Sequence, residues 1–305
     1  MDPVRVYVGT DRSQLLAVKV LEHSIKRHTQ LPVEVYPMLD LPIRKTKDPR
    51  QRQRTGFSFS RFCIPNLCNY NGRAIYMDAD MLVFKDIAEL WNWPFENHTI
   101  LLQRTLNNEQ AKKNKHGAPP RRIRQCAVML IDCQNNTWKI DDIIDSLDTK
   151  KYTYEDLMYD LCIIDDDKVG EVLPFEWNSL EHYDQGTRLI HYTDMNTQPW
   201  TSTMNPWAEK WFEEVRLMLS NGSLTWAELK GEIKLGYFRP SLVLDLNFGH
   251  LVPKFLESAF NFSQKLWDKF LGFKPHKEVY AAKALRDKLI KEYEHSLKQA
   301  PSHPN

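Results

Sequence analysis

Residues 74–84 read AIYMDADMLVF, an apolar run that carries two carboxylates, Asp78 and Asp80. If the whole run were one strand, both aspartates would point to the same face, because side chains alternate along a strand. Charged side chains are rarely buried without a partner. The run therefore predicts a buried strand whose carboxyl end presents two negative charges to something that binds them.

A divalent cation is one such partner. Mg²⁺ and Mn²⁺ prefer carboxylate oxygens, and two carboxylates separated by the small Ala79 could hold one ion. Open coordination positions would then remain for the phosphates of a ligand. The alternative is structural, with Asp78 and Asp80 capping a turn or pairing with Arg73 or Lys85. The sequence Asp78-Ala79-Asp80 by itself leaves both interpretations open.

The elements predicted around this run indicate an α/β fold. VRVYVGT (4–10) has the composition of a strand, and apolar residues at helical spacing follow from Ser13. A second strand is predicted at 33–36, so the chain alternates strand and helix, which favours a mostly parallel sheet flanked by helices. FSRFCIPNLC (59–68) predicts a short helix broken at Pro65. Further strands or extended segments are predicted in 100–105, 125–133, 172–178 and 188–194, and further helices in 138–147, 153–164 and 207–222.

The predicted sheet also suggests where a ligand would bind. In open α/β sheets ligands bind beyond the carboxyl ends of strands, which is where the two aspartates are expected. Arg61 precedes this strand, and its guanidinium suits a phosphate better than an ammonium would. The alternative for Arg61 is an ordinary surface cation.

Charge and cysteine content exclude some classes of protein. The 41 basic and 40 acidic residues nearly balance, which argues against a dedicated nucleic-acid binder. The five cysteines are odd in number and lack metal-site or redox spacing, so reduced thiols are expected. The first residues do not resemble a secretion signal, and no apolar run is long enough to span a bilayer. We therefore expect a cytoplasmic protein.

Basic residues gather in three places. Two are stretches expected to be loops, 44–54 and 107–124, and their basic parts, 44–54 and 112–124, are either solvated or a rim for an anionic acceptor. The third is the C-terminal region, where 265–298 holds nine Lys and Arg against five Asp and Glu among apolar residues at helical spacing. We expect a helical extension over 223–305, following a catalytic domain over 1–222. The extension would pack on the domain, mediate self-association, or lie on the inner face of an anionic membrane.

Several segments in order resemble the family 8 glycosyltransferases, the group that contains glycogenin and bacterial lipopolysaccharide galactosyltransferases. They are VRVYVGTDRSQ from residue 4, FSRFCIPNLC from 59, AIYMDADMLVFKDIAELW from 74, CAVMLID from 126, LPFEWN from 173 and HYTDMNTQPW from 191. The resemblance covers roughly residues 4–212. It implies a GT-A fold, a nucleotide-sugar donor such as a UDP-sugar, Mn²⁺ (or Mg²⁺), and transfer of a hexose with retention of anomeric configuration.

The resemblance also assigns roles to residues. It implies Asp78, Asp80 and His191 as metal ligands, and imidazole is a good ligand for Mn²⁺-type ions. The residues implied to bind the donor are Gly9, Thr10, Asp11, Arg61, Asp78, Ala79 and Gln198. The acceptor-side catalytic candidates are Gln125, which stands where an asparagine is usual, and the acidic pair Glu155 and Asp156.

The chain departs from the family pattern around its histidine block. Between His191 and the Pro199-Trp200 pair it is one residue longer than the family's HxxGxxKPW sequence. Asp194 and Met195 stand in the region of the glycine, and Gln198 replaces a lysine that faces the phosphates. The family's Asp-Gln acceptor motif is also not visible where it is expected.

The predicted reaction is attack of an acceptor hydroxyl on the anomeric carbon, displacing a nucleoside diphosphate. No protein nucleophile stands out, so front-face substitution is expected, with the diphosphate accepting the proton. The acceptor is a saccharide, a lipid-linked molecule or a protein. Two alternatives remain: a nucleotide-sugar-binding scaffold that has lost turnover, which Gln198 favours, and a metal-dependent nucleotidyltransferase or phosphoesterase.

Overall fold

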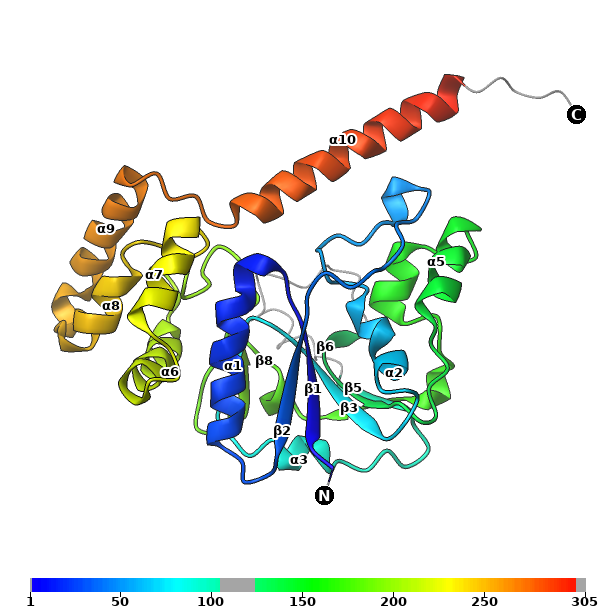
Figure 1. Ribbon diagram of the computed structural model, residues 1–305, viewed down its shortest axis with the longest axis horizontal. Coiled ribbons are helices and arrows are strands. Elements are labelled where there is room, and N and C mark those ends of the chain that lie inside the picture. Colours follow the sequence, from blue (N-terminus) through cyan, green and yellow to red (C-terminus); the bar gives the residue numbers. More distant parts are fainter. Residues whose placement is uncertain (1, 105–123, 300–305) are drawn as a thin grey trace, which may run out of the picture.

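The computed structural model describes residues 2–104 and 124–299. Its centre is a six-stranded sheet with the order β2-β1-β3-β6-β5-β7 (Figure 1). The strands are β1 (Val4–Gly9), β2 (Val33–Met38), β3 (Arg73–Asp78), β5 (Ile100–Gln103), β6 (Gln125–Asp132) and β7 (Val169–Leu173). β1 pairs in parallel with β2 and β3, and β5 with β7, whereas β6 runs antiparallel to both neighbours. The predicted mixed, mostly parallel sheet is confirmed.

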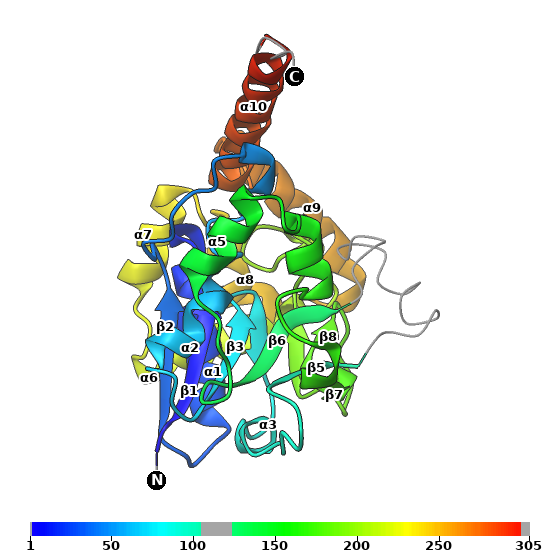
Figure 2. The same cartoon turned by 90° about the vertical axis from the view of Figure 1, so that its right-hand side faces the viewer.

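The helices cover both faces of this sheet, as Figures 1 and 2 show. Valines of β1 pack against Val18, Leu21 and Ile25 of α1 on one face. Tyr7 and Tyr76 meet the apolar residues of α2 and α5 on the other. The helices are α1 (Leu15–Arg27), α2 (Ile64–Leu67), α3 (Ala88–Trp91), α5 (Ile140–Asp148), α6 (Ala208–Asn221), α7 (Trp226–Leu235), α8 (Leu242–Phe248), α9 (Lys254–Phe270) and α10 (Lys277–Gln299).

The run that carries the two aspartates is not one strand. β3 ends at Asp78, and β4 (Met81–Val83) belongs to a second, three-stranded sheet with the order β4-β9-β8. The other members of that sheet are β9 (Leu189–His191) and β8 (Ser179–Leu180). The expectation that alternation along one strand aligns Asp78 and Asp80 is therefore wrong. Both carboxylates reach the same cavity because the chain turns between two sheets at Ala79.

Local differences from the predicted elements have simple causes. Pro65 lies in the first turn of α2, where the missing N–H costs nothing, so it begins the helix rather than breaking it. Residues 153–164 form only a short helical segment, 154–160, which is π-helical over Asp156–Asp160 and is closed by Leu161 in the left-handed conformation. Part of the predicted extended segment 172–178 is a 3-10 helix, Phe175–Trp177. The predicted loop 107–124 lies outside the described residues, except for Arg124.

The C-terminal region forms helices, as predicted. α7 and α8 join the same apolar cluster as α1 and α6, through Leu229, Leu242 and Leu246. α9 lies beyond them at the edge of the molecule, and α10 extends from there across the top of Figure 1. Among the described residues, no helix combines the length and apolar character needed to cross a bilayer.

Candidate active site

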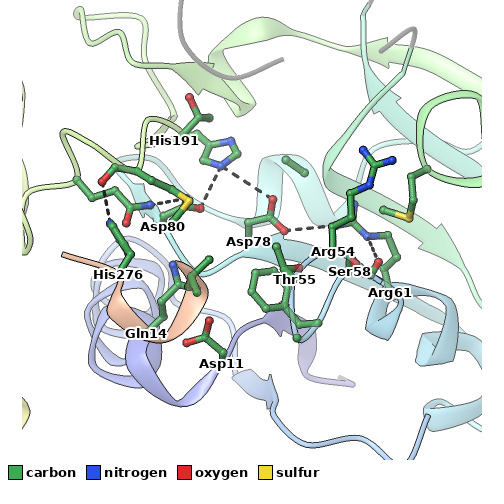
Figure 3. A pocket seen from close by; sticks show the side chains of 18 of the residues that line it. Asp11, Gln14, Arg54, Thr55, Ser58, Arg61, Asp78, Asp80, His191 and His276 are labelled. Atoms are coloured by element: carbon green, nitrogen blue, oxygen red, sulfur yellow. Dashed lines mark hydrogen bonds and ion pairs between the residues drawn. The ribbon is translucent and has the colours of Figure 1, made fainter. Parts of the chain in front are cut away.

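A cavity of about 450 Å³ opens at the carboxyl end of β3, between the two sheets (Figure 3). Seven of the residues predicted from the sequence line it: Asp11, Arg61, Asp78, Asp80, Gln125, His191 and Gln198. The end of β1 and the break between β3 and β4 contribute from one side, and β9 from the other. Asp11 and Gln198 are 187 positions apart in the sequence, and the structure brings both to one cavity.

Asp78, Asp80 and His191 form a compact cluster in this cavity. One ligand atom from each lies within 4.8 Å of the others. His191 Nε2 is 3.1 Å from a carboxylate oxygen of Asp80 and 4.0 Å from one of Asp78. Met81 of β4 stands opposite His191 of β9 in an antiparallel pair, so strand pairing brings the imidazole to the aspartates. Two carboxylate oxygens and one imidazole nitrogen suit a divalent ion of the Mn²⁺ or Mg²⁺ kind.

The orientation of His191 is set by an amide behind it. Asn178 donates from Nδ2 to Gln103 Oε1 over 2.6 Å, which leaves its Oδ1 facing His191 Nδ1 at 2.9 Å. An amide oxygen can only accept, so the proton sits on Nδ1, and Nε2 is the nitrogen that faces the carboxylates. All three side chains are buried. Burial alone would lower the pKa of His191, but Asp80 and then Asp78 outweigh it, so the pKa is raised.

Arg61 braces Asp78 from the other side of the cavity. Its guanidinium stacks on the Tyr76 ring at 4.4 Å from the centroid and donates to the Tyr76 hydroxyl over 3.0 Å. That hydroxyl donates to Asp78 Oδ1 over 2.7 Å, and Arg61 Nη2 is 3.6 Å from the same oxygen. A further bond runs from Arg61 to the Cys126 carbonyl. Arg61 is therefore a buried cation fixed beside the cluster rather than a surface side chain.

Gln198 is fully buried and contacts the cluster directly. Its Nε2 donates to Asp80 Oδ2 over 2.8 Å and to the Tyr192 carbonyl over 3.1 Å. Its Oε1 is buried without a hydrogen-bond partner among the described residues. A neutral amide thus occupies the place where the resemblance leads one to expect a cation, and it helps to hold Asp80.

Gly9 is needed for this arrangement because Tyr76 crosses the end of β1. A Cβ at Gly9 would lie 2.2 Å from the Tyr76 hydroxyl oxygen and 2.9 Å from Phe57 Cδ2. The next residues turn the chain into α1: Asp11 Oδ1 accepts from the Ser13 backbone N–H and hydroxyl. Thr10 and Ala79 are buried and lie beside lining residues without lining the cavity themselves.

The acidic pair predicted on the acceptor side is not among the cavity-lining residues, although Glu155 contacts Arg54, which is one of them. Glu155 forms an ion pair with Arg54, and Asp156 accepts from the backbone N–H and hydroxyl of Thr153. Gln125, by contrast, is a lining residue and is buried. Of the three candidates, only Gln125 lines the cavity directly.

Several cations of the stretch 44–54 are already paired with carboxylates. Arg44 binds Asp145 and Asp148, and Arg50 binds Asp48. Arg54 of the same stretch, however, lines the cavity, so both interpretations of 44–54, a solvated loop and a rim for an anionic acceptor, stay open.

Sequence reasoning missed part of the site. Residues 276–282 form one wall of the cavity through His276, Glu278, Val279 and Ala282. His276 Nε2 lies 2.7 Å from the Met195 carbonyl oxygen, which docks this wall on the histidine block. No motif marks these residues. Asn178 is the last residue of the LPFEWN segment, so the resemblance includes it. Nothing in that segment indicates that Asn178 contacts His191.

Comparison with known proteins identifies the family of the chain. The model of "Glycosyl transferase family 8" matches residues 5–159, about half of the chain. The chain belongs to that family. A curated relative, Protein CDI of Arabidopsis thaliana, is 28% identical over 223 residues, covering 68% of this chain and 81% of that protein. The mixed, mostly parallel sheet with helices on both faces is the GT-A-type arrangement that was predicted, so the predicted family and fold class are confirmed.

The structure of the chain is also similar over part of its length to those of several solved glycosyltransferases. The galactosyltransferase LgtC in complex with donor and acceptor sugar analogues has 15% sequence identity and a TM-score of 0.49, covering 75% of this chain and 100% of that one. The WbbM bifunctional enzyme has the same identity, TM-score and coverage of this chain, but only 51% of its own length is matched. GlyE of Streptococcus pneumoniae has 17% identity and a TM-score of 0.49, covering 70% of this chain and 60% of that one. The chain thus spans about half to three fifths of the last two proteins.

Proposed function

We propose that the protein is a retaining, metal-dependent hexosyltransferase that uses a nucleotide-sugar donor, with a UDP-sugar and Mn²⁺ (or Mg²⁺) as the expected pair. The observation that carries the proposal is the cluster of Asp78, Asp80 and His191 in a cavity at the carboxyl end of β3. Family membership supports the reaction class.

The three residues of the cluster would hold the ion. When bound, it would supply positive charge for the phosphates of the leaving nucleoside diphosphate. The residues of the chain prepare for this: Asn178 keeps Nε2 of His191 facing the carboxylates, and Gln198 and Arg61 fix Asp80 and Asp78. Because these supports are buried, the ligand atoms are held in place before a substrate arrives.

The reaction we propose forms a bond between the acceptor oxygen and the anomeric carbon, and breaks the bond from that carbon to the diphosphate. In the front-face substitution that we propose, the acceptor's proton goes to the departing diphosphate. Carboxylates outside the cluster, Glu181 and Glu278 among them, also line the cavity. Gln125 lines the cavity and would orient the acceptor. The predicted roles of Glu155 and Asp156 remain predictions, as do the identity of the acceptor and the cytoplasmic location.

The alternative function is a scaffold that binds a nucleotide sugar without turning it over. One observation favours it: Gln198 is neutral, buried and engaged with Asp80, so the phosphates lose a cation that the family pattern includes. Arg61 would have to supply the missing positive charge from its fixed position.

Nucleotide-sugar hydrolysis with Mn²⁺ distinguishes these functions. The purified protein is incubated with a panel of UDP- and GDP-sugars, and the products are separated by chromatography. Free sugar plus nucleoside diphosphate supports the transferase. Sugar phosphate plus nucleoside monophosphate would indicate phosphoesterase chemistry, and binding without turnover would indicate the scaffold.

The matched variants are Asp80→Ala and Asp184→Ala. Asp184 lies in an exposed turn outside the cavity lining, so its variant controls for the loss of a carboxylate. Asp80→Ala should abolish Mn²⁺-dependent hydrolysis. Its circular dichroism spectrum should match that of the wild type, and its melting transition should stay cooperative. Full activity of Asp80→Ala would overturn the metal assignment.

A further inference from the structure

Helix α9 turns its polar side to the protein and its apolar side to solvent. The buried residues of this helix are Gln264 and Asp268, which are 1% and 7% exposed. Both are hydrogen-bonded to the region before and within α8. Arg239 Nη1 donates to Gln264 Oε1 over 2.9 Å, and the Ser241 backbone N–H donates to Asp268 Oδ1 over 2.7 Å. An amphipathic helix on a folded domain normally packs the other way round.

The outer side of α9 carries large apolar side chains. Phe255 is 83% exposed, Phe270 81% and Phe262 62%. Leu266 and Trp267 are about half exposed, at 52% and 51%. Because residues at intervals of three, four or seven share one face of a helix, these side chains form a continuous stripe. Single exposed apolar residues are ordinary, but a stripe of aromatic residues marks an interaction surface.

The buried polar contacts hold α9 in this orientation. Arg239 is 1% exposed and forms an ion pair with Asp245, whose other oxygen accepts from Gln264 Nε2 over 2.9 Å. Rotating α9 to bury its aromatic side chains would separate Gln264 from Arg239 and Asp245, and Asp268 from Ser241. Breaking buried polar contacts on one side only is costly. The apolar stripe therefore faces outward as a property of the fold.

The charges beside the stripe are positive. Lys254, Lys265 and Lys269 of α9 are exposed, as is Lys274 just after it. Among the described residues, no ion pair joins these lysines to a carboxylate. Glu257 is the one exposed acidic residue of α9, since Asp268 is buried. A partner that offers apolar contact together with negative charge would satisfy both features.

We propose that the outer face of α9 binds the surface of a membrane that contains anionic lipids. The aromatic side chains would enter the boundary between headgroups and acyl chains, and the lysines would contact the lipid phosphates and carboxylates. A second copy of the chain fits less well. A two-fold contact between two α9 helices would bring together three exposed lysines from each copy against one exposed carboxylate, Glu257. Figure 1 shows α9 at the outer edge of the molecule, where a flat surface can approach it.

The proposal does not depend on the enzymatic function, and vesicle sedimentation tests it with the full chain. Wild-type protein is mixed with vesicles of phosphatidylcholine alone or with about one third phosphatidylserine. We expect the protein to sediment with the anionic vesicles, and to be released by salt. Phe255→Ser/Phe270→Ser should lower the partition coefficient about tenfold or more, because both rings are removed from the interface. Leu67→Ser, an exposed apolar residue of α2, is the control.

A second set of variants tests the charges. Lys254→Gln/Lys265→Gln/Lys269→Gln should lower the partition about tenfold or more on anionic vesicles, while the control Lys45→Gln/Lys139→Gln/Lys151→Gln should not. The substituted side chains in both triples are exposed, so folding is expected to persist. Two results would overturn the proposal. One is a wild-type protein that does not sediment with anionic vesicles. The other is a dimer without lipid, seen by light scattering, that Phe255→Ser/Phe270→Ser dissociates.

Discussion

Asn178 Oδ1 lies 2.9 Å from Nδ1 of His191, and the other nitrogen of that imidazole lies 3.1 Å from Asp80. The amide cannot rotate to offer its nitrogen instead, because Nδ2 is held by Gln103 Oε1. A buried pair of amides thus decides which nitrogen of His191 is available as a ligand. We expect measurable effects from substitutions of Asn178, of Gly9 beneath Tyr76, of the neutral Gln198, and of Glu228, which joins α7 to α1.

Asn178→Ala should weaken Mn²⁺ binding about tenfold to a hundredfold, as loss of an outer partner of a metal-binding histidine does. Without the amide, His191 can turn or carry its proton on Nε2. Mn²⁺ titration followed by electron paramagnetic resonance measures the affinity without requiring turnover. Asn135→Ala, at an exposed turn, is the control. Equal Mn²⁺ affinities of Asn178→Ala and the wild type would show that Asn178 does not orient His191 for metal binding.

Gly9→Ala should destabilise the protein by about 1–3 kcal/mol, as overpacking in a well-packed region does. The added methyl group would meet the Tyr76 hydroxyl oxygen at 2.2 Å, so Tyr76 must move and Asp78 loses a donor. Urea denaturation measures the free energy of unfolding, and Mn²⁺ affinity should fall with it. Gly56→Ala is a close control because its Cβ would come no nearer than 4.0 Å to Asp11 Cβ. Comparable stability of both variants would contradict the packing argument.

Gln198→Lys should tighten the binding of UDP in the presence of Mn²⁺ about tenfold, because a charged donor binds phosphate more strongly than a neutral one. The new ammonium group would be partnered by Asp80, which accepts from Gln198 Nε2 over 2.8 Å. Calorimetric titration gives the dissociation constant. Gln134→Lys adds the same charge at an exposed position outside the cavity lining. If both variants bind UDP as the wild type does, the diphosphate does not approach position 198.

Glu228 should make folding stability fall in acid. Lys19 and then Thr225 lower the pKa of Glu228 to about 2. The unfolded chain has an ordinary glutamate pKa of about 4.3, so this stabilisation is complete above that value and is lost as the pH falls towards about 2. Glu228 also completes the capping box of α7 with Thr225.

Glu228→Gln should therefore be less stable than the wild type near neutral pH, and the difference should shrink between about pH 5 and pH 2. Urea denaturation across this range measures it. Lys19→Met, which removes the salt bridge but keeps the cap, should reduce the same acid dependence in part. A stability difference that stays constant down to pH 2 would show that Glu228 acts without its charge.

Part of the site could be predicted from the sequence because it depends on local order. The apolar run before Asp78 and the β-branched run before Gly9 specify strand ends, and strand ends of an open sheet define where a ligand binds. The resemblance added His191, and the structure brings it to the aspartates. The same reasoning placed Asp78 and Asp80 on one strand, which is wrong, because strand composition does not reveal that β3 and β4 belong to different sheets.

Other parts depend on contacts between distant segments. His276 reaches the cavity through the docking of residues 276–282 on the Met195 carbonyl, and no spacing in the sequence encodes that contact. Asn178 and Gln103 are 75 positions apart, and they meet only when both sheets have formed. Such polar partners are chosen by burial, where each donor and acceptor must be satisfied.

The sequence by itself indicated the family through its resemblance, and most strands of the large sheet and the amphipathic character of α9 through composition and periodicity. Only the tertiary structure decided which side of α9 faces water. Periodicity separates the polar and apolar faces of a helix, but it does not say which one the rest of the chain will bind. In this protein the buried residues Arg239 and Ser241 bind the polar face of α9, and the aromatic face is therefore exposed to solvent.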